Sequence, residues 1–406
     1  AVPFREIPAR AMAKEIPHWV YSEVVQVKLK SGKTGVGETM LFYTWSVPTD
    51  EIVASSIGRN AAELMWDDEL GAGLQMALFD AVAKTMEVPV HALLGTKRYS
   101  ETPLSWWNID TSPEDMASEC KLALEQGYLA YKTKGRPWFD LWEQMERTTK
   151  VVPPAFKIDM DFNDSLLDAE RAIGILKQFE HYPQVDIWET PIPQSDIAGN
   201  RRITAEMKAR VAMHYGDPHP LEVFRERACD GFVVGGSAKT VLEANAACEL
   251  ADLPFWLQLT GTGITAAWSL HFGGVASQAK WPAVNCHQLY THNLLTAPIV
   301  VKDGKAAVPD RPGLGYDLDL DAVAKFRVPK PPKRPDPPRL IETTWPDGRR
   351  MVLGSHGVHN FILTQANRGH IPYFERGVTT RLIPNDGSAK WKDLYDRAGP
   401  EKPLFL

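Results

Sequence analysis

The segment Gly127-Tyr-Leu-Ala-Tyr-Lys-Thr-Lys134 is a short apolar run that ends in a charged residue, and the chain repeats this pattern three times. The next runs end at Asp161, Glu189 and Asp217, at intervals of 27, 28 and 28 residues. One strand, one covering helix and two short loops need an interval of this length. The pattern therefore predicts successive βα units, which close into a barrel whose active site lies at the carboxyl ends of the strands.

The predicted barrel occupies residues 101–290. Amphipathic helical stretches, as at 112–125, 165–180 and 239–250, separate its apolar strand candidates. These strand candidates begin near residues 103, 128, 155, 185, 210, 231, 254 and 283. Alternation of strand and helix is typical of a parallel α/β architecture, and eight strands is the number that closes a (β/α) barrel.

Two other regions flank the predicted barrel. Residues 1–100 combine a strand-like hairpin at 18–42 with helical periodicity at 49–95, which indicates a separate α+β domain. Residues 328–406 begin with a Pro-rich linker and continue with short strand signals and a short helix near 389–397. We expect this extension to be either a small appendage or an arm around a neighbouring subunit, and its role stays open.

Composition and charge narrow the class of protein. The 406 residues carry a net charge of −6, which argues against a nucleic-acid partner because such a partner requires a basic surface. No run approaches the roughly 20 apolar residues of a membrane span, so we expect no membrane partner. Four cysteines lie far apart without a CxxC pair, as core thiols of a reducing compartment do, and we expect a cytoplasmic protein. The sequence starts at Ala1 without a methionine, so the removal of a leader stays open.

The charged residues that end the strands define a candidate site. Parallel strands of a barrel end at one rim, so Lys134, Asp161, Glu189 and Asp217 are expected to lie close together. Three carboxylates from successive strands suit Mg²⁺, which prefers hard oxygen ligands. A lysine beside them is a candidate base.

A zinc site is an alternative interpretation of the same region. His214, Asp217 and His219 form an H-x-x-D-x-H pattern whose imidazoles could bind Zn²⁺. On a regular strand, however, His214 faces the opposite side from Asp217, and His219 follows Pro218 in a loop. We therefore favour Mg²⁺ over zinc, and we keep His219 as a candidate substrate-binding residue in the loop after the fifth barrel strand.

Motifs at matching spacing extend over about three-quarters of the chain. They are Gly35-Val-Gly37-Glu38, Ala77-Leu-Phe-Asp80, Lys132-Thr-Lys134, Asp161-Phe-Asn163, Glu189-Thr-Pro191, Gly216-Asp217 and Val308-Pro-Asp-Arg-Pro312-Gly-Leu-Gly315. In this order they resemble the enolase superfamily, in the branch of mandelate racemase and muconate lactonizing enzyme. The resemblance implies an α/β fold with an α+β capping domain at 1–100, a modified TIM (β/α)7β-type barrel at 101–290, a return to the capping domain at 291–327, and a C-terminal extension.

The resemblance also implies a shared half-reaction, in which Mg²⁺ holds a substrate carboxylate and a base removes the proton on the adjacent carbon. Asp161, Glu189 and Asp217 match the three metal-ligand positions, although the third position is more usually Glu. Lys134 matches the base. Lys132 has the same strand parity, and we expect it to lower the pKa of Lys134 or to bind the substrate carboxylate.

Three further residues are candidates around the substrate. Asn163 matches a position next to the metal ligands. Gln258, on the seventh barrel strand, is either a hydrogen-bond donor to the substrate or a packing residue, because an amide cannot act as a base. His287, on the eighth strand, is either an acid or electrophile or a structural histidine. Relatives that racemise their substrate carry a second base near these strands, and the sequence near Gly235 and at Gln258 shows none.

One clear base favours an acid-sugar (hydroxy acid) dehydratase, because elimination of water needs one base and one acid. A racemase, epimerase or cycloisomerase is the alternative. A non-catalytic carboxylate-binding or assembly protein is an alternative of another class, motivated by the missing second base and the long extension. We expect a small carboxylate as the substrate and a homo-oligomer as the assembly. Substrate identity depends on capping loops such as Phe42-Tyr-Thr-Trp45, whose contacts cannot be derived from sequence.

Overall fold

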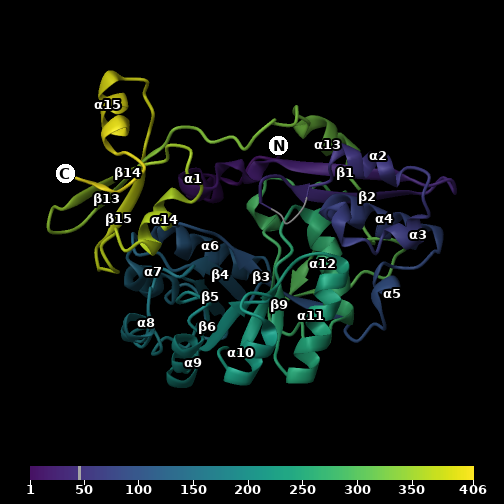
Figure 1. The fold of residues 1–406 in the computed structure, drawn as a ribbon, viewed down its shortest axis with the longest axis horizontal. Coiled ribbons are helices and arrows are strands. Elements are labelled where there is room, and N and C mark those ends of the chain that lie inside the picture. The colour runs from purple at the N-terminus through teal and green to yellow at the C-terminus, as the bar shows by residue number, and fades with distance from the viewer. Residues whose placement is uncertain (44–46) are drawn as a thin grey trace.

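The centre of the protein is a parallel barrel. The computed structural model describes residues 1–43 and 47–406. Strands β3 to β9 pair in parallel in chain order, and β10 pairs with β3, which confirms the predicted (β/α)7β arrangement (Figure 1). The alternating elements are β3 (Glu101–Trp107), α6 (Pro113–Glu125), β4 (Ala130–Lys134), α7 (Leu141–Thr148), β5 (Lys157–Asp161), α8 (Ala169–Leu176), β6 (Val185–Glu189), α9 (Ile197–Glu206), β7 (Arg210–His214), α10 (Pro220–Glu226), β8 (Gly231–Val234), α11 (Ala238–Ala251), β9 (Phe255–Leu257), α12 (Gly263–Val275) and β10 (Ala283–Val284).

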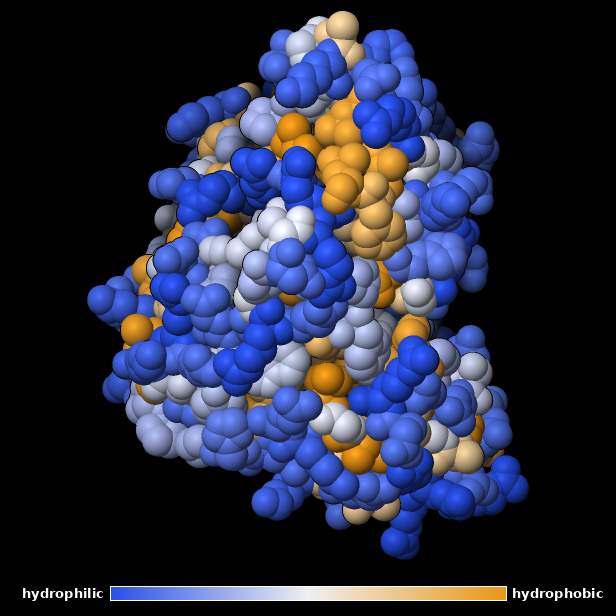
Figure 2. All heavy atoms as spheres, turned by 90° about the vertical axis from the view of Figure 1, so that its left-hand side faces the viewer, coloured by the Kyte–Doolittle hydropathy of each residue, from blue (hydrophilic) through white to orange (hydrophobic). Residues whose placement is uncertain are grey.

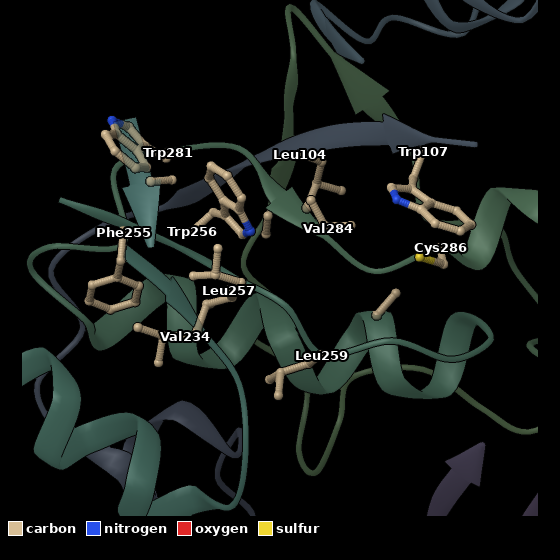
Figure 3. Packing of buried hydrophobic residues seen from close by; sticks show 14 of the residues in the cluster. Leu104, Trp107, Val234, Phe255, Trp256, Leu257, Leu259, Trp281, Val284 and Cys286 are labelled. Atoms are coloured by element: carbon tan, nitrogen blue, oxygen red, sulfur yellow. The ribbon is translucent and has the colours of Figure 1, made fainter. Parts of the chain in front are cut away.

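Backbone hydrogen bonds and apolar packing complete the barrel wall between β9 and β10. Trp281 N donates to Phe255 O over 3.2 Å, and Gly261 N donates to Asn285 O over 3.0 Å. Buried side chains from several strands pack around this junction, and those labelled in Figure 3 include Leu104, Trp107, Val234, Trp256, Leu257, Leu259, Val284 and Cys286. The interior of the barrel is therefore a packed core, and the room for a ligand lies at its rim.

The register of the strands brings charged residues to one rim. Lys134 lies opposite Asp161 across β4 and β5, and Asp161 lies opposite Glu189 across β5 and β6. Ala212 of β7 lies opposite Glu189. The predicted convergence of the first three charged strand ends is therefore confirmed by the pairing of the backbone.

The fourth charged strand end differs from the prediction. The sequence pattern places the end of the fifth barrel strand at Asp217, but β7 ends at His214. Tyr215 N still donates to Val233 O (3.0 Å), and Gly216 then adopts φ 121°, a conformation open to glycine that turns the chain out of the sheet. Asp217 consequently belongs to the loop after β7.

The starts of the barrel helices follow local capping. Ser112 accepts a hydrogen bond from Asp115 N (3.1 Å), which confirms the predicted start of α6. The predicted helix at 165–180 is shorter in the structure. Asp168 caps α8 by accepting from Arg171 N (2.9 Å), and Leu167 before it has φ 66°, so the helix cannot begin earlier.

The capping domain joins a two-stranded antiparallel sheet to a small helical layer. Its glycines allow a close approach, because a Cβ on Gly35 would lie 2.0 Å from Ala77 O, and one on Gly37 would lie 2.0 Å from Gly73 O. These glycines therefore let α4 lie directly on β2. The elements are β1 (Ser22–Lys28), β2 (Thr34–Met40), α2 (Asp50–Ser56), α3 (Ala61–Leu64), the 3₁₀ helix η2 (Asp68–Leu70), α4 (Ala72–Thr85) and α5 (His91–Leu94).

Glu38 of β2 fixes the capping domain to the barrel. Its carboxylate is buried and accepts hydrogen bonds from Thr262 N (2.9 Å) and from Thr265 Oγ1 (2.9 Å) at the start of α12. Ser22 Oγ donates to the same carboxylate over 2.7 Å. A buried carboxylate is stable when it accepts several hydrogen bonds and lies at the amino end of a helix. The motif around Glu38 thus has a structural role in orienting the capping domain.

The residues before the capping hairpin form a helix that the sequence patterns do not predict. It is α1 (Glu6–Glu15), followed by the 3₁₀ helix η1 (Pro17–Val20). Pro8 interrupts the apolar periodicity, but it lies in the first turn, where proline is tolerated. Arg5 anchors the start of α1 to the barrel by two hydrogen bonds to Glu119 of α6, at 2.7 and 3.0 Å.

Residues after the barrel return to the capping domain. They contain the 3₁₀ helix η3 (His287–Leu289), β11 (Val301–Lys302), β12 (Lys305–Ala307) and α13 (Leu320–Phe326). β12 pairs antiparallel with the start of β3. Leu314 N then donates to the buried carboxylate of Asp80 in α4 (2.8 Å), which also accepts from Val36 N (2.8 Å). Asp80 therefore joins the helix, the hairpin and the return segment.

The C-terminal extension is a small α+β unit that packs on the barrel of its own chain (Figure 1). Its four-stranded antiparallel sheet has the order β15-β13-β14-β16. From the side of this extension, hydrophilic side chains cover most of the surface and apolar ones gather in limited patches (Figure 2). The structure thus supports the appendage among the two expectations. The elements are β13 (Leu340–Thr344), β14 (Arg350–Gly354), α14 (Phe361–Asn367), β15 (Thr379–Ile383), α15 (Ala389–Arg397) and β16 (Leu404–Phe405).

Glu15, at the end of α1, is a buried carboxyl group between the barrel and the extension. Its Oε1 accepts a hydrogen bond from Ile362 N of α14 (2.8 Å). Burial and the neighbouring Asp110 raise the pKa of Glu15 to about 8, although Arg136 acts in the opposite direction. Since the folded chain prefers the protonated form, this group stabilises the fold most below its ordinary pKa of 4.5. That contribution is lost as the pH rises from 4.5 through about 8.

We expect Glu15→Gln to raise the free energy of unfolding by a few kcal/mol at about pH 9 and to have little effect at about pH 4.5. Glutamine keeps an acceptor for Ile362 N and carries no charge. Thermal unfolding followed by circular dichroism at both pH values measures the difference between the variant and the wild type. An equal stability of the two proteins at the higher pH would contradict the role given to Glu15.

A membrane-crossing helix needs about 20 apolar residues. Within residues 1–43 and 47–406, no helix combines that length with the necessary apolar character. All four cysteines are buried and unpaired with one another, as expected for core thiols.

Candidate active site

Three neighbouring compartments lie at the carboxyl ends of the barrel strands, with volumes of about 160, 500 and 420 Å³. We call them the central, outer and cap-side compartments. His214 lines all three, Asn163 lines the central and outer ones, and Gln258 lines the central and cap-side ones. Because they share these residues, we treat the compartments as one site.

An ion cluster dominates the central compartment. Lys132 Nζ lies 2.5 Å from Glu189 Oε2 and 3.8 Å from Asp161 Oδ2, and Lys134 also forms an ion pair with Asp161. The side chains of Lys132, Asp161 and Glu189 are at most 2% exposed, and that of Lys134 is 13% exposed. The structure therefore brings four of the predicted site residues together, with Lys134 the one that solvent or a ligand can reach.

The charged groups of the ion cluster change one another's pKa. Burial and the ammonium group of Lys132 lower the pKa of Lys134, against the attraction of Asp161. Burial opposes the charge of Lys132, but Glu189 and Asp161 outweigh it and raise the pKa of Lys132. Burial likewise opposes the charge of Asp161, but the two lysines hold its pKa below the ordinary value. The two lysines thus differ, and Lys134 is the one that gives up its proton more easily.

Asn163 and Arg136 hold Asp161 in place. Asn163 N and Nδ2 donate to the two carboxylate oxygens of Asp161, over 2.8 and 3.1 Å. Arg136 is buried and donates to Asn163 Oδ1 (3.1 Å) and to Asp110 Oδ1 (3.2 Å). Arg136 follows Lys134 by two residues but belongs to none of the sequence motifs that predict the site. The amide of Asn163 is hydrogen-bonded to Asp161 and to Arg136. Its predicted contact with substrate stays a prediction.

Asp161 and Glu189 have the chemistry of divalent-cation ligands. Both Glu189 oxygens are buried and accept no hydrogen bond of good geometry, and their closest polar neighbours are the Lys132 ammonium group and the His214 ring. A buried carboxylate of this kind is stable only beside positive charge. Hard carboxylate oxygens suit Mg²⁺. In the described ranges, however, no three His, Cys, Asp or Glu side chains converge as a complete metal site.

The positions of Asp217 and His214 differ from those that the sequence pattern predicts: His214, not Asp217, ends the strand β7. Asp217 is exposed in the loop after β7 and lines the outer compartment, where its backbone O accepts from Gln194 Nε2 (2.6 Å). His214 ends β7 and places its Nε2 3.1 Å from Glu189 Oε1. Its parity is that of Ala212, which lies opposite Glu189. His214 therefore faces Glu189, and its predicted orientation away from the site is wrong, because Asp217 is not a residue of the strand.

Gln258 lies beside the ion cluster, as predicted. Its Oε1 accepts a hydrogen bond from Lys132 Nζ (3.0 Å), and Gln258 lines both the central and cap-side compartments. The ring of Trp256 lies 5.3 Å from the same ammonium group. Gln258 therefore positions Lys132, and its predicted contact with substrate stays a prediction.

Two predicted site histidines lie elsewhere. His287 is buried and its Nε2 lies 3.1 Å from Tyr128 Oη, and burial lowers its pKa to about 4. His219 is exposed at the start of α10, where its Nδ1 accepts from Leu221 N (3.3 Å). Neither lines any of the three compartments as the described residues form them. This placement supports the structural role among the two alternatives for His287.

An aromatic wall closes the central compartment on the side of the capping domain. The Trp19 ring lies 4.1 Å from that of Tyr43 and is stacked at 5.3 Å on that of Trp107, measured between centroids. Tyr43 belongs to the loop at 42–45 that was expected to contact substrate, and it lines both the central and cap-side compartments. Residues 44 and 45 of that loop lie outside the described residues.

The C-terminal extension also lines the site. His359, Asn360 and Leu363 line the central compartment, and Leu363 and Asn367 line the outer one. Ile16, after α1, belongs to the same wall. The sequence carries no signal for these residues, because their place over the barrel depends on contacts between distant parts of the chain.

Comparison with known proteins gives the family. Residues 115–322, from α6 to α13, match the family model described as "Enolase C-terminal domain-like". N-succinylamino acid racemase of Thermus thermophilus is 26% identical over 273 aligned residues, covering 63% of this chain and 71% of that protein. D-gluconate dehydratase of Thermoproteus tenax is 24% identical over 385, covering 80% and 74%. The solved structure of muconate cycloisomerase from Pseudomonas fluorescens has a TM-score of 0.63 at 21% identity, covering 75% and 94%.

The chain belongs to the enolase superfamily, in the branch of mandelate racemase and muconate lactonizing enzyme, as the resemblance of its motifs predicts. The solved structures establish the fold. The relatives include racemases, cycloisomerases and dehydratases, so the chain is an enzyme of this superfamily. Their names do not agree on one reaction, and none of these proteins is a non-catalytic binding protein.

Proposed function

We propose that this enzyme removes the proton on the carbon next to a substrate carboxylate, with Lys134 as the base. The ion cluster carries the proposal, because it places two lysines against two buried carboxylates at the rim of the barrel. Lys134 is the partly exposed member, so its amine can reach a ligand in the central compartment. Lys132 is held by Glu189 and Gln258 and is placed to bind the substrate carboxylate.

Mg²⁺ is the proposed cofactor, and Asp161 and Glu189 would hold it. When bound, the ion would stabilise the negative charge that develops on the substrate carboxylate as the proton leaves. For the third ligand we keep the predicted Asp217, which lines the outer compartment beside Asn163. Asn163 and Arg136 keep Asp161 oriented whether or not a ligand is present.

We further propose that the reaction is elimination of water from a hydroxy acid. The ends of β8 and β9 present Gly235 and Gln258 to the site, and neither accepts a proton. His214 lines all three compartments and is partly exposed, so it is placed to act as an acid. Lys134 takes the α-proton, and the electrons of the C–H bond form a C=C bond. The β C–O bond breaks, the departing oxygen takes a proton from His214 and leaves as water, and the enol becomes a 2-keto acid.

A racemase or epimerase is the second candidate, and His214 is also the observation that favours it. An imidazole can accept a proton as well as donate one. Because His214 comes from β7 and Lys134 from β4, the two groups can address a bound carbon from different directions. Homo-oligomerisation and a cytoplasmic location stay expectations from the sequence.

Incubation with a series of hydroxy acids in D₂O tests the proposed function. We expect formation of a 2-keto acid, detected by its reaction with a carbonyl reagent, and deuterium at C3 of the product in the NMR spectrum. Recovery of both stereoisomers with deuterium at the α-carbon, and without keto acid, would instead establish the racemase. An absence of both exchange and product over the series would contradict proton abstraction itself.

Replacing Asp161 by Asn should weaken Mg²⁺ binding by about 10–100-fold or more, because a charged oxygen ligand is lost. Asn keeps the size of the side chain, so the fold is expected to persist. Isothermal titration calorimetry with Mg²⁺ alone measures the affinity. Asp186→Asn serves as the matched control. Asp186 lies at the start of β6, at the end of that strand away from Glu189, and pairs with Arg210. Unchanged affinity in Asp161→Asn would remove Asp161 from the metal site.

A further inference from the structure

The C-terminal extension is fixed to the barrel by a shared core and by a hydrogen bond to a buried aspartate. Trp138 and Phe139, in the loop between β4 and α7, are 0% and 2% exposed and belong to the hydrophobic core of the extension. Gly377 N of the extension donates to Asp140 Oδ2 in the same loop (2.6 Å). This loop directly follows β4, which ends in Lys134. The position of the extension is therefore tied to that of the proposed base.

This docking brings the first turn of α14 over the site. His359, Asn360 and Leu363 line the central compartment together with the ion cluster. Leu363 and Asn367 continue the wall into the outer compartment. Asn367 Nδ2 donates to the backbone O of Asn163 (2.9 Å), the residue that orients Asp161. The extension thus contacts the catalytic rim directly.

The side chains of this turn are free to contact a ligand. Asn360 starts α14 with φ 49°, and its side chain forms no capping hydrogen bond. Among the residues that the structure describes, the side chains of His359 and Asn360 have no hydrogen-bond partner, and the His359 ring lies 5.4 Å from the ring of His18, measured between centroids. Leu363 is partly exposed, although it is apolar. Polar groups without a partner beside a partly exposed leucine are the composition of a binding wall.

We propose that His359, Asn360 and Leu363 select the substrate. Asn360 and His359 form hydrogen bonds with a polar group at the end of the acid that is distant from its carboxylate, and Leu363 limits the length of the acid. The inference rests on the proposed function, because the ion cluster must hold the carboxylate for the other end to face α14. The substrate class is then a short hydroxy acid with a distal hydroxyl or carbonyl oxygen.

Full-length variants test this inference on a series of sugar acids of increasing length and on lactate, which lacks a distal polar group. Asn360→Gly is the preferred variant, because glycine adopts a positive φ without strain. With Mg²⁺ present, we expect Asn360→Gly and His359→Ala to raise KM for the best sugar acid by about 10-fold, with kcat changed less than about 3-fold. Leu363→Ala is expected to move the preference to longer acids. Lactate has no β-hydroxyl group and cannot lose water by the proposed reaction, so it serves as a binding probe only, and the first two variants should bind it as the wild type does.

Asn385→Ala is the matched control, because Asn385 lies in an exposed loop of the extension away from the site. Thermal unfolding shows whether each variant is folded. Calorimetric binding of the same acids separates this inference from the proposed function. If the wild type binds a sugar acid without turning it over, the proposed function fails. A 10-fold weaker binding by Asn360→Gly would still support the proposed role of α14 in selecting the ligand. Unchanged KM and binding in all three variants, or equal binding of sugar acids and lactate by the wild type, would overturn the inference.

Discussion

Replacing Lys134 by Met is expected to reduce turnover by about 10²–10⁴-fold, the range that a general base contributes. Methionine keeps the length of the side chain and removes the amine that accepts the α-proton. Mg²⁺ binding should persist, because the variant leaves both carboxylates of Asp161 and Glu189 in place. Steady-state kinetics on the best acid of the series measures turnover, and calorimetry measures the metal.

Two companion variants sharpen this test. Lys134→Arg keeps a positive charge beside Asp161, but a guanidinium does not give up its proton in proteins, so we expect it to be as inactive as Lys134→Met. Lys150→Met changes an exposed lysine outside the site and should behave as the wild type. If Lys134→Met instead lost Mg²⁺ binding or unfolded, the lysine would have a structural role. Full activity in Lys134→Arg would exclude it as the base.

Replacing Trp138 by Ala is expected to lower the free energy of unfolding by about 3–5 kcal/mol, as for other fully buried tryptophans. The indole is 0% exposed in the core of the extension, and the Arg136 guanidinium lies over its ring at 5.1 Å. Its loss removes packing on both sides of the contact between barrel and extension. We therefore expect KM to rise along with the loss of stability, because Asn360 and Leu363 lose their support.

Hydrogen exchange with mass spectrometry locates this change. In Trp138→Ala, the strands of the extension (340–383) should exchange faster than in the wild type, while β4 to β6 of the barrel keep their protection. Trp138→Phe retains an aromatic ring and is expected to restore most of the stability and the KM. Uniform acceleration over the whole chain would mean that extension and barrel unfold as one unit, and unchanged exchange in the extension would contradict the anchoring role of Trp138.

Much of the fold can be predicted from the sequence, because parallel strands produce a simple repeating pattern in it. Each strand is a short buried run, and each interval must accommodate one helix, so Lys134, Asp161 and Glu189 mark successive strand ends at nearly equal spacing. The same physics places these side chains on one rim, since the strands pair in register. Local rules also identify the cap of α6 at Ser112.

Counting residues along the chain fails to locate side chains where the backbone departs from regular strand geometry. After β7, Gly216 has φ 121°, so the spacing that reaches Asp217 no longer reports strand position, and His214 ends the strand instead. After β10, Cys286 has φ 61°, which breaks the alternation of sides. Cys286 then lines the central compartment, while His287 lies against Tyr128. Single residues in left-handed conformations cannot be located by counting along a strand.

Other parts of the site depend on contacts that are distant in sequence. Ile16 and Asn360 line the same compartment although nearly the whole chain separates them. Neither belongs to a motif, and their positions follow from the packing of α1 and the extension on the barrel. Only a three-dimensional arrangement can identify such residues.

The shared core around Trp138 also has a consequence for the order in which the enzyme becomes competent. The strands that carry the ion cluster, β4 to β6, pair with their neighbours in the chain, whereas the wall over the site requires loops of about 200 residues or more to close, as in the contact of Asn367 with Asn163. Closing loops of this length costs more chain entropy than pairing neighbouring strands, so we expect these contacts to form later in folding. The ion cluster can therefore exist before the pocket does, and a protein whose barrel is intact can still be unable to hold its substrate. Binding, rather than circular dichroism, is the sensitive reporter of a fully folded molecule.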